Sequence, residues 1–190
     1  MGEGKHIETE RKYLIRYPDT AVLAAQPGCE VWQIEQIYLA EGGAGTPCAG
    51  TQRAGTQCAG TPFAETRRIR RVMTGGECRY YRTFKRFVSA MSSEEDEARI
   101  SEAEFRAFER EADPESRPVL KTRYRVPYAG HVLEFDVYPF WSDRAILEIE
   151  LERENEPFEI PGDVEIIRDV TGEPAYKNRA LARSVPMEAL

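Results

Sequence analysis

Polar and apolar residues alternate one by one in several segments of the chain. In the clearest segment, Leu147, Ile149 and Leu151 share one side, while Glu148, Glu150 and Glu152 share the other. Successive side chains of a β-strand point to opposite faces, so this two-residue period predicts strands. Pro and Gly residues between the segments predict turns. The pattern predicts eight strands, at residues 6–15, 32–40, 65–73, 78–88, 94–100, 119–126, 131–138 and 145–152.

Two regions depart from the strand pattern and predict short helices. Ser101 and Glu104 have the spacing of a capping box, in which each side chain bonds a free backbone N–H at a helix start. Two phenylalanines then share one face of this helix, which should end before Pro114 because proline disfavours a helical conformation in the residue before it. The tail, residues 169–183, predicts a turn followed by a short closing helix.

Length and loop composition bound the domain organisation. A chain of 190 residues predicts a single domain, here over residues 1–190. Residues 44–63 repeat Ala-Gly-Thr at five-residue intervals and hold few large apolar side chains. Such a segment buries too little surface to offset the entropy lost on ordering. It therefore predicts a flexible, low-complexity loop inserted at about 42–64, between the second and third strands.

Composition and charge argue against several classes of protein. The formal net charge of −7 argues against broad binding to nucleic acids or to acidic membranes. No apolar run reaches the length of a membrane span, and the N-terminus lacks the apolar core of a secretion signal. The four cysteines show no paired short spacing, so neither a zinc site nor a disulfide framework is expected. We expect a cytoplasmic protein with reduced thiols, no nucleic-acid partner and no membrane attachment.

The charged faces of the predicted strands are segregated by sign. The strand at 119–126 carries a basic polar face, while those at 131–138 and 145–152 carry acidic ones. One explanation is a solvated face of an antiparallel sheet, where charged residues need no further purpose. Because like charges on neighbouring strands repel, segregation also indicates two halves of one site. Carboxylate oxygens suit a hard divalent cation such as Mg²⁺, and clustered Arg and Lys suit phosphate oxygens.

Short motifs in a fixed order establish a family resemblance. Residues 8–12, Glu-Thr-Glu-Arg-Lys, resemble the Glu-x-Glu-x-Lys signature of the CYTH superfamily, the triphosphate tunnel metalloenzymes. The C-terminal segment with Tyr176 and Asn178 is also similar to the family's. Two positions depart from the pattern: Ser93 stands where Arg is usual, and Ala175 where a basic residue is common. The motifs between, in family order, are Gln36-x-Tyr38, Arg68-x-Arg70, Thr83-x-Lys85, Glu95-x-Glu97, Lys121-x-Arg123, Glu134-x-Asp136 and Glu148-x-Glu150.

The resemblance implies a fold and a site. The implied fold is α+β but predominantly β: an eight-stranded antiparallel closed barrel, or tunnel, with a few short helices. The tunnel would bind a triphosphate together with Mg²⁺ or Mn²⁺. The implied metal ligands are Glu8, Glu10, Glu148 and Glu150, with Glu152 a weaker candidate. The implied phosphate-binding residues are Lys12, Arg68, Arg70, Lys85, Lys121 and Arg123. The implied catalytic residues are Lys12, Lys85, Glu97, Glu134 and Asp136. The acids among them, and Glu95, would either order water or hold the basic residues through salt bridges.

The resemblance favours metal-dependent hydrolysis of a small-molecule triphosphate, with inorganic triphosphate as the first substrate to expect. Thiamine triphosphatase and adenylate cyclase activities occur on the same fold and stay open alternatives. A non-catalytic module that binds polyphosphate or nucleotides would keep the basic residues and could lose the carboxylates, all of which are present here. A β-domain with a solvated charged face and a protein partner would show no dependence on a metal. Whether the chain forms a homodimer is left open.

Overall fold

The computed structural model describes residues 4–40 and 65–188. The loop expected at about 42–64 lies outside these described residues. Each predicted strand is present, with bounds that differ by a few residues. The strands are β1 (Gly4–Arg16), β2 (Glu30–Tyr38), β3 (Glu65–Thr74), β4 (Glu77–Phe87), β5 (Ser92–Ile100), β6 (Val119–Tyr128), β7 (His131–Val137) and β8 (Arg144–Leu151). The remaining elements are α1 (Thr20–Ala24), α2 (Glu102–Glu109), β9 (Ile166–Asp169), the 3₁₀ helix η1 (Pro174–Tyr176) and α3 (Asn178–Leu181).

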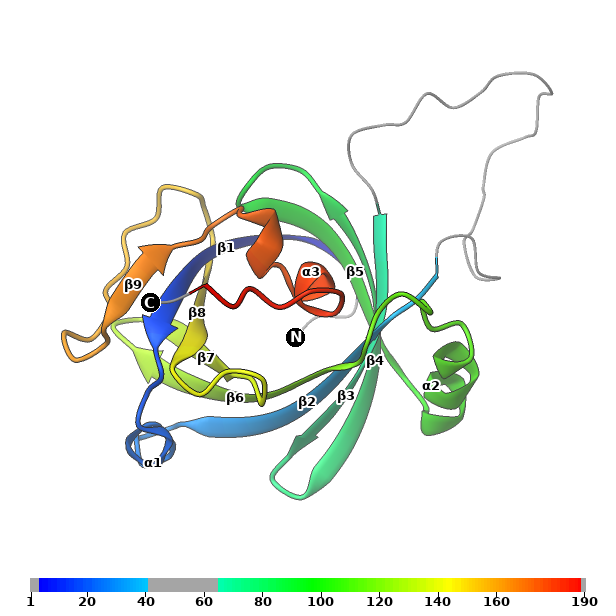
Figure 1. The fold of residues 1–190 in the computed structure, drawn as a ribbon, viewed down its shortest axis with the longest axis horizontal. Helices are drawn as coiled ribbons and strands as arrows, with labels where there is room; N and C mark the ends of the chain where they lie inside the picture. The colour runs from blue at the N-terminus through cyan, green and yellow to red at the C-terminus, as the bar shows by residue number, and fades with distance from the viewer. Residues whose placement is uncertain (1–3, 41–64, 189–190) are drawn as a thin grey trace.

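Eight of the strands close into an antiparallel barrel (Figure 1). Their order around the barrel is β5-β4-β3-β2-β6-β7-β8-β1, and β1 pairs back onto β5. Closure gives each of these strands a neighbour on both sides, which removes the exposed edges of an open sheet. The predicted fold class, predominantly β with a closed eight-stranded barrel and a few short helices, is confirmed.

Two short elements were not predicted from the sequence. β9 pairs with residues 13–15 of β1 on the edge that β5 occupies only along residues 4–9. α1 follows Asp19, whose carboxylate accepts hydrogen bonds from the backbone N–H groups of Ala21 and Val22. Both elements are too short to produce a hydrophobic period. Within the described residues, no helix is both long and apolar enough to cross a bilayer.

The apolar faces of β1, β7 and β8 point to the outside of the barrel. Ile15, Leu133, Phe135, Leu147 and Ile149 are all buried in one cluster on this outer surface. Side chains from α1 and from the chain after β8 cover the cluster, namely Leu23, Phe158, Ile160 and Val164. Because side chains alternate along a strand, covering the apolar faces outside leaves the charged faces of the same strands to point inward.

Helix α2 covers a second part of the outer surface, over β3 and β4 (Figure 1). Its capping box between Ser101 and Glu104 is present, as predicted. Phe105 has no exposed surface and packs with Ile37 and Ile69 of the barrel wall. The helix therefore adds to the outer packing and contributes no residue to the barrel interior.

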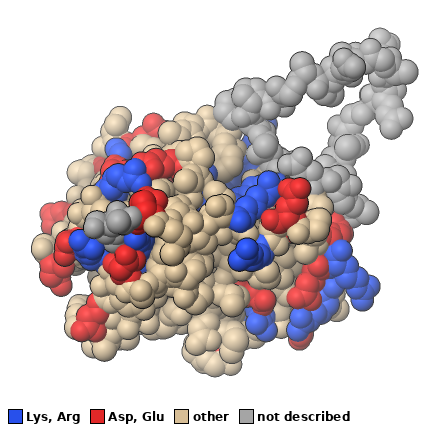
Figure 2. Space-filling model, in the orientation of Figure 1, with Lys and Arg blue, Asp and Glu red and all other residues tan. Residues whose placement is uncertain are grey.

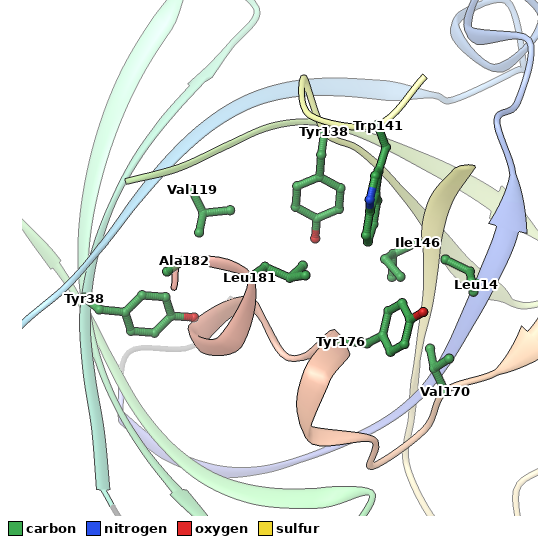
Figure 3. Close-up of a cluster of buried hydrophobic side chains, with 10 residues drawn as sticks. All are labelled: Leu14, Tyr38, Val119, Tyr138, Trp141, Ile146, Val170, Tyr176, Leu181 and Ala182. Atoms are coloured by element: carbon green, nitrogen blue, oxygen red, sulfur yellow. The ribbon is translucent and has the colours of Figure 1, made fainter. Parts of the chain in front are cut away.

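The C-terminal segment fills one end of the barrel interior (Figure 1). Tyr176 of η1 and Leu181 of α3 pack against Leu14, Ile146 and Val119, which point inward from the barrel wall (Figure 3). The predicted closing helix is therefore present, and it lies inside the barrel. Viewed from this side, the molecular surface is largely uncharged at its centre, and its charged residues gather toward the rim (Figure 2).

Candidate active site inside the barrel

Next to the apolar end, the barrel interior holds a cavity with charged walls. β1 supplies three residues from alternate positions, Glu8, Glu10 and Lys12. The antiparallel register sets Glu10 opposite Glu150 of β8 and Lys12 opposite Glu148. Nine of the predicted site residues line this one cavity: Glu8, Glu10, Lys12, Arg68, Arg70, Lys85, Lys121, Arg123 and Glu148.

The remaining predicted residues lie behind or beside the cavity wall. Glu97 pairs with Arg70 and accepts a hydrogen bond from the Thr83 hydroxyl at 2.9 Å. Glu134 pairs with Arg123. Both contacts are of the kind expected if these acids hold the basic residues in place through salt bridges. The catalytic assignment of Glu97, Glu134 and Asp136 stays a prediction.

Asp136 anchors the most buried basic residues of the site. Its side chain has no exposed surface and accepts hydrogen bonds from Lys121 Nζ at 2.5 Å and Arg123 Nε at 2.6 Å. A second Arg123 nitrogen donates to the same carboxylate at 2.7 Å. This two-bond contact fixes the plane of the guanidinium group, because both partners are flat and rigid. Burial and the Arg123 charge lower the pKa of Lys121 from its ordinary value.

Charge pairing decides the ionisation of the deeper acids. Burial opposes the charged form of Glu95, but Arg68 and Lys85 outweigh it and lower the pKa of this carboxyl to about 2. Burial likewise opposes ionisation of Glu148, and Lys12 and Arg123 hold its pKa well below the ordinary value. The pKa values of Lys12 and Lys85 are raised because neighbouring carboxylates outweigh their burial. These groups are therefore charged at neutral pH.

The four predicted metal ligands have the right chemistry for a hard cation, carboxylate oxygens on two paired strands. Three of them are bonded to bases: Glu8 to Lys85, Glu10 to Lys12, and Glu148 to Lys12 and Arg123. Glu150 is an exposed residue. Partial loss of hydration of its carboxyl group, together with the charges of Glu8 and Glu134, raises its pKa. In the described part of the chain, no group of three or more acids, histidines or cysteines is gathered as a metal site.

The structure adds cavity residues that the sequence analysis did not single out as ligands. Lys177, just before α3, lines the cavity, and its Nζ lies 3.6 Å from the centre of the Phe87 ring. It stands two residues after Ala175, where the family pattern has a basic residue, so the cavity regains a cation from the C-terminal segment. Its position next to Tyr176, in the C-terminal segment that resembles the family's, is the feature of the sequence that could have indicated this residue. Gln36, Thr66 and Arg179 also contribute to the lining.

Searches of sequence and structure place this barrel among known proteins. No protein-family model and no curated protein matches the chain in sequence. The solved structure of the inorganic triphosphatase NE1496 matches over 95% of this chain and 97% of its own, with 26% identity and a TM-score of 0.52. PH1819 from Pyrococcus horikoshii OT3 matches over 78% of this chain and 80% of its own, with 21% identity and a TM-score of 0.51. This chain fits a CYTH domain.

The CYTH resemblance of the motifs and the architecture therefore agree. The barrel closure and the inward-facing Glu-x-Glu-x-Lys motif of residues 8–12 are both present. The structure also shows where the two departures from the family pattern lie. Ser93 is buried on β5 directly opposite Glu8. Ala175 lies in η1, next to Tyr176 in the apolar end of the barrel.

Proposed function

We propose that the CYTH cavity binds the phosphate chain of a triphosphate and supports its hydrolysis together with a divalent cation. The observation that carries the proposal is the state of Arg68 and Arg70 on β3. Both side chains line the cavity, and each has a buried Nε–H with no hydrogen-bond partner among the described residues. A buried donor without a partner is costly, and these two donors share one cavity with Lys85, Lys121 and Arg123, so the pair favours an anion that accepts from both groups.

The similarity to NE1496 supports the same reaction. That protein is described as an inorganic triphosphatase. We take inorganic triphosphate as the first substrate of this chain on that ground and on the character of the cavity. Most of the residues that line the described cavity are charged, and Tyr38 and Phe87 are the only aromatic residues among them.

The residues of the chain divide the work between binding and positioning. Arg68, Arg70 and Lys85 would hold phosphate oxygens from one side, and Lys121 and Arg123 from the other. Phosphoryl transfer is helped mainly by such positioning and by electrostatic stabilisation. Asp136 and Glu97 keep the cations in place before the substrate arrives.

The carboxylates of β1 and β8 would hold the divalent cation. Glu8, Glu10, Glu148 and Glu150 are the candidate ligands, and Mg²⁺ or Mn²⁺ matches their oxygens. The cation supplies charge neutralisation on the phosphate chain and orientation of the attacking water when it is bound. We further propose a cytoplasmic location, in keeping with the free thiols of Cys29 and Cys78.

A substrate screen tests the proposal. The purified chain is supplied with tripolyphosphate, thiamine triphosphate or ATP, each with Mg²⁺, Mn²⁺ or EDTA, and phosphate and cyclic AMP are both measured. We expect phosphate release from tripolyphosphate that requires the metal. Cyclic AMP as the main product from ATP would instead identify a cyclase. Tight binding of all three without turnover would identify a binding module.

Replacing Glu8 by alanine tests the carboxylate assignment. Glu8→Ala should lower the metal-dependent rate by on the order of 100-fold, because charge stabilisation in the transition state is lost. The melting temperature should change little, since Glu8 is among the more exposed members of the cavity. Glu77→Ala, which removes an exposed acid of β4, is the matched control and should keep the wild-type rate. A wild-type rate in Glu8→Ala would refute the assignment.

A further inference from the structure

The two halves of the candidate site are bonded to each other. Glu8 accepts from Lys85 Nζ, and Lys12 Nζ lies 3.3 Å from Glu10 and 2.8 Å from Glu148. The acids are those assigned to a cation, and the lysines are those assigned to phosphate. We propose that a divalent cation and a phosphate chain bind this cavity cooperatively, because each ligand releases the residues that the other needs. The inference rests on the proposed function and adds the coupling between its two ligands at the same site.

Each lysine has one deep and one shallow carboxylate partner. Lys85 lies 2.8 Å from Glu95, whose side chain is 4% exposed, and also bonds Glu8, which is 22% exposed. Lys12 bonds Glu148, 9% exposed, and Glu10, 27% exposed. The deep partner can keep the lysine in the cavity when the shallow one turns away. Glu8 and Glu10 are therefore the exchangeable members of the two pairs.

The lysines are better suited to exchange than the arginines. An ammonium group is a single charge on a flexible stem, so it can turn from a carboxylate to a phosphate oxygen without losing a fixed geometry. Arg123, by contrast, makes two bonds to Asp136 and further bonds to Glu134 and Glu148. Its guanidinium is held in one plane. Exchange therefore concentrates at Lys12 and Lys85.

Charge balance makes the coupling reciprocal. Glu8 can turn to a cation only by leaving Lys85, which then keeps an ammonium group in a mostly buried place with fewer negative neighbours. A phosphate oxygen restores the balance. The reverse holds when phosphate draws Lys85 away from Glu8. Binding free energies of two coupled ligands change by the same amount in both directions, and such couplings typically reach about 5–150-fold in affinity.

Two variants measure the competition with one ligand at a time. Lys85→Met removes the competitor for Glu8, so Mn²⁺ in phosphate-free buffer should bind at least about fivefold more tightly than to the wild type. Glu8→Gln removes the competitor for Lys85, so tripolyphosphate in EDTA should bind more tightly by a similar factor. Isothermal titration calorimetry measures both affinities. Using single ligands avoids complexes between Mn²⁺ and tripolyphosphate in solution.

Matched variants separate exchange from a general change in charge. Lys177→Met removes a cation of the same cavity that forms no ion pair with a carboxylate among the described residues. Glu35→Gln removes an acid of β2 that pairs with Arg71 outside the cavity. Lys177→Met should change the affinity for Mn²⁺, and the acid variant the affinity for tripolyphosphate, by less than about twofold. That is below the range of about 5–150-fold expected for coupled ligands. Circular dichroism checks folding, and Lys12→Met with Glu10→Gln repeats the test if the first pair fails to fold.

The outcomes are distinct from those of the proposed function. Unchanged or weaker single-ligand binding in Lys85→Met and Glu8→Gln would overturn the coupling, even if the wild type hydrolyses tripolyphosphate. Equal tightening in Lys177→Met and Glu35→Gln would overturn it too, since general electrostatics would then suffice. A wild type that hydrolyses no triphosphate with either metal would overturn the proposed function, and the wild-type turnover assay shows this independently of the binding data.

Discussion

The cavity has two regions that use the same residue types in different ways. In the Asp136 cluster, made of Lys121, Arg123 and Asp136, acid and bases lie on the neighbouring strands β6 and β7. In the lysine pairs, Glu8–Lys85 and Glu10–Lys12, the side chains extend from β1 and β4. The Asp136 carboxylate has no exposed surface, whereas both shallow acids of the lysine pairs retain some.

This difference in burial separates a fixed part of the site from an exchangeable one. Breaking a fully buried ion pair leaves an uncompensated charge, so such a pair holds its geometry at all times. A partly exposed pair can be replaced by water or ligand at lower cost. The Asp136 cluster therefore fixes the positions of two cations, while the lysine pairs can respond to ligands. The predictions that follow test this division.

The largest effect is expected at the centre of the fixed cluster. Asp136→Ala should lower the free energy of unfolding by about 3–5 kcal/mol, because Lys121 and Arg123 both lose their buried partner. Urea denaturation followed by circular dichroism measures the change. Glu165→Ala breaks an exposed pair with Arg16 and should cost no more than about 1 kcal/mol. Similar small losses in both variants would remove the distinction between the two regions.

A smaller, pH-dependent effect is expected at Glu95, which bonds Lys85 of one lysine pair and also Arg68. Its pKa is lowered from 4.5 to about 2 in the folded state. A lowered folded-state pKa stabilises the fold above the unfolded value, and this contribution disappears as the pH falls toward 2. Its size is at most about 3 kcal/mol, from 1.36 kcal/mol per pH unit.

Glu95→Gln provides the measurement. The difference in unfolding free energy between wild type and variant should be largest near pH 6 and shrink steadily as the pH is lowered. This result would identify Glu95 as the fixed anchor from which Lys85 exchanges. A difference that stays constant with pH would show instead that the residue contributes through shape and hydrogen bonding. Glu94→Gln, at the preceding position of β5 and half-buried, is the control.

The strands of both regions could be predicted, but their pairing inside the barrel could not. Alternation places Lys121 and Arg123 on one face, and Glu134 and Asp136 on another, without any structure. Which acid meets which base depends on register and barrel closure, which bring β1 next to β5 although many residues separate them. The sequence therefore indicated two charged halves, and only the structure shows that Glu8 bonds Lys85.

The missed elements have the same physical origin. β9 has mostly exposed residues and pairs with β1 only where β5 has left that edge free. Lys177 enters the cavity because Tyr176 and Leu181 pack inside the barrel, and no local pattern of the tail states this. The outward packing of Leu147 and Ile149 depends equally on the chain after β8. Features set by distant packing are the ones that periodicity leaves undetermined.

The smallest of these effects on the fold, with a clear effect on binding, is expected at Arg70. Arg70→Ala should raise KM for tripolyphosphate by about 10-fold or more, since hydrogen bonds to charged groups contribute about 1.5–3 kcal/mol. Arg71→Ala, the adjacent residue of β3 that pairs with Glu35, removes the same charge outside the cavity and should leave KM unchanged. The unfolding free energy should fall less in Arg70→Ala than in Asp136→Ala, because Glu97 keeps its bond from Thr83. An unchanged KM with a large loss of stability would assign Arg70 to the fixed cluster, and the buried Nε–H groups of β3 would then need an explanation other than an anionic ligand.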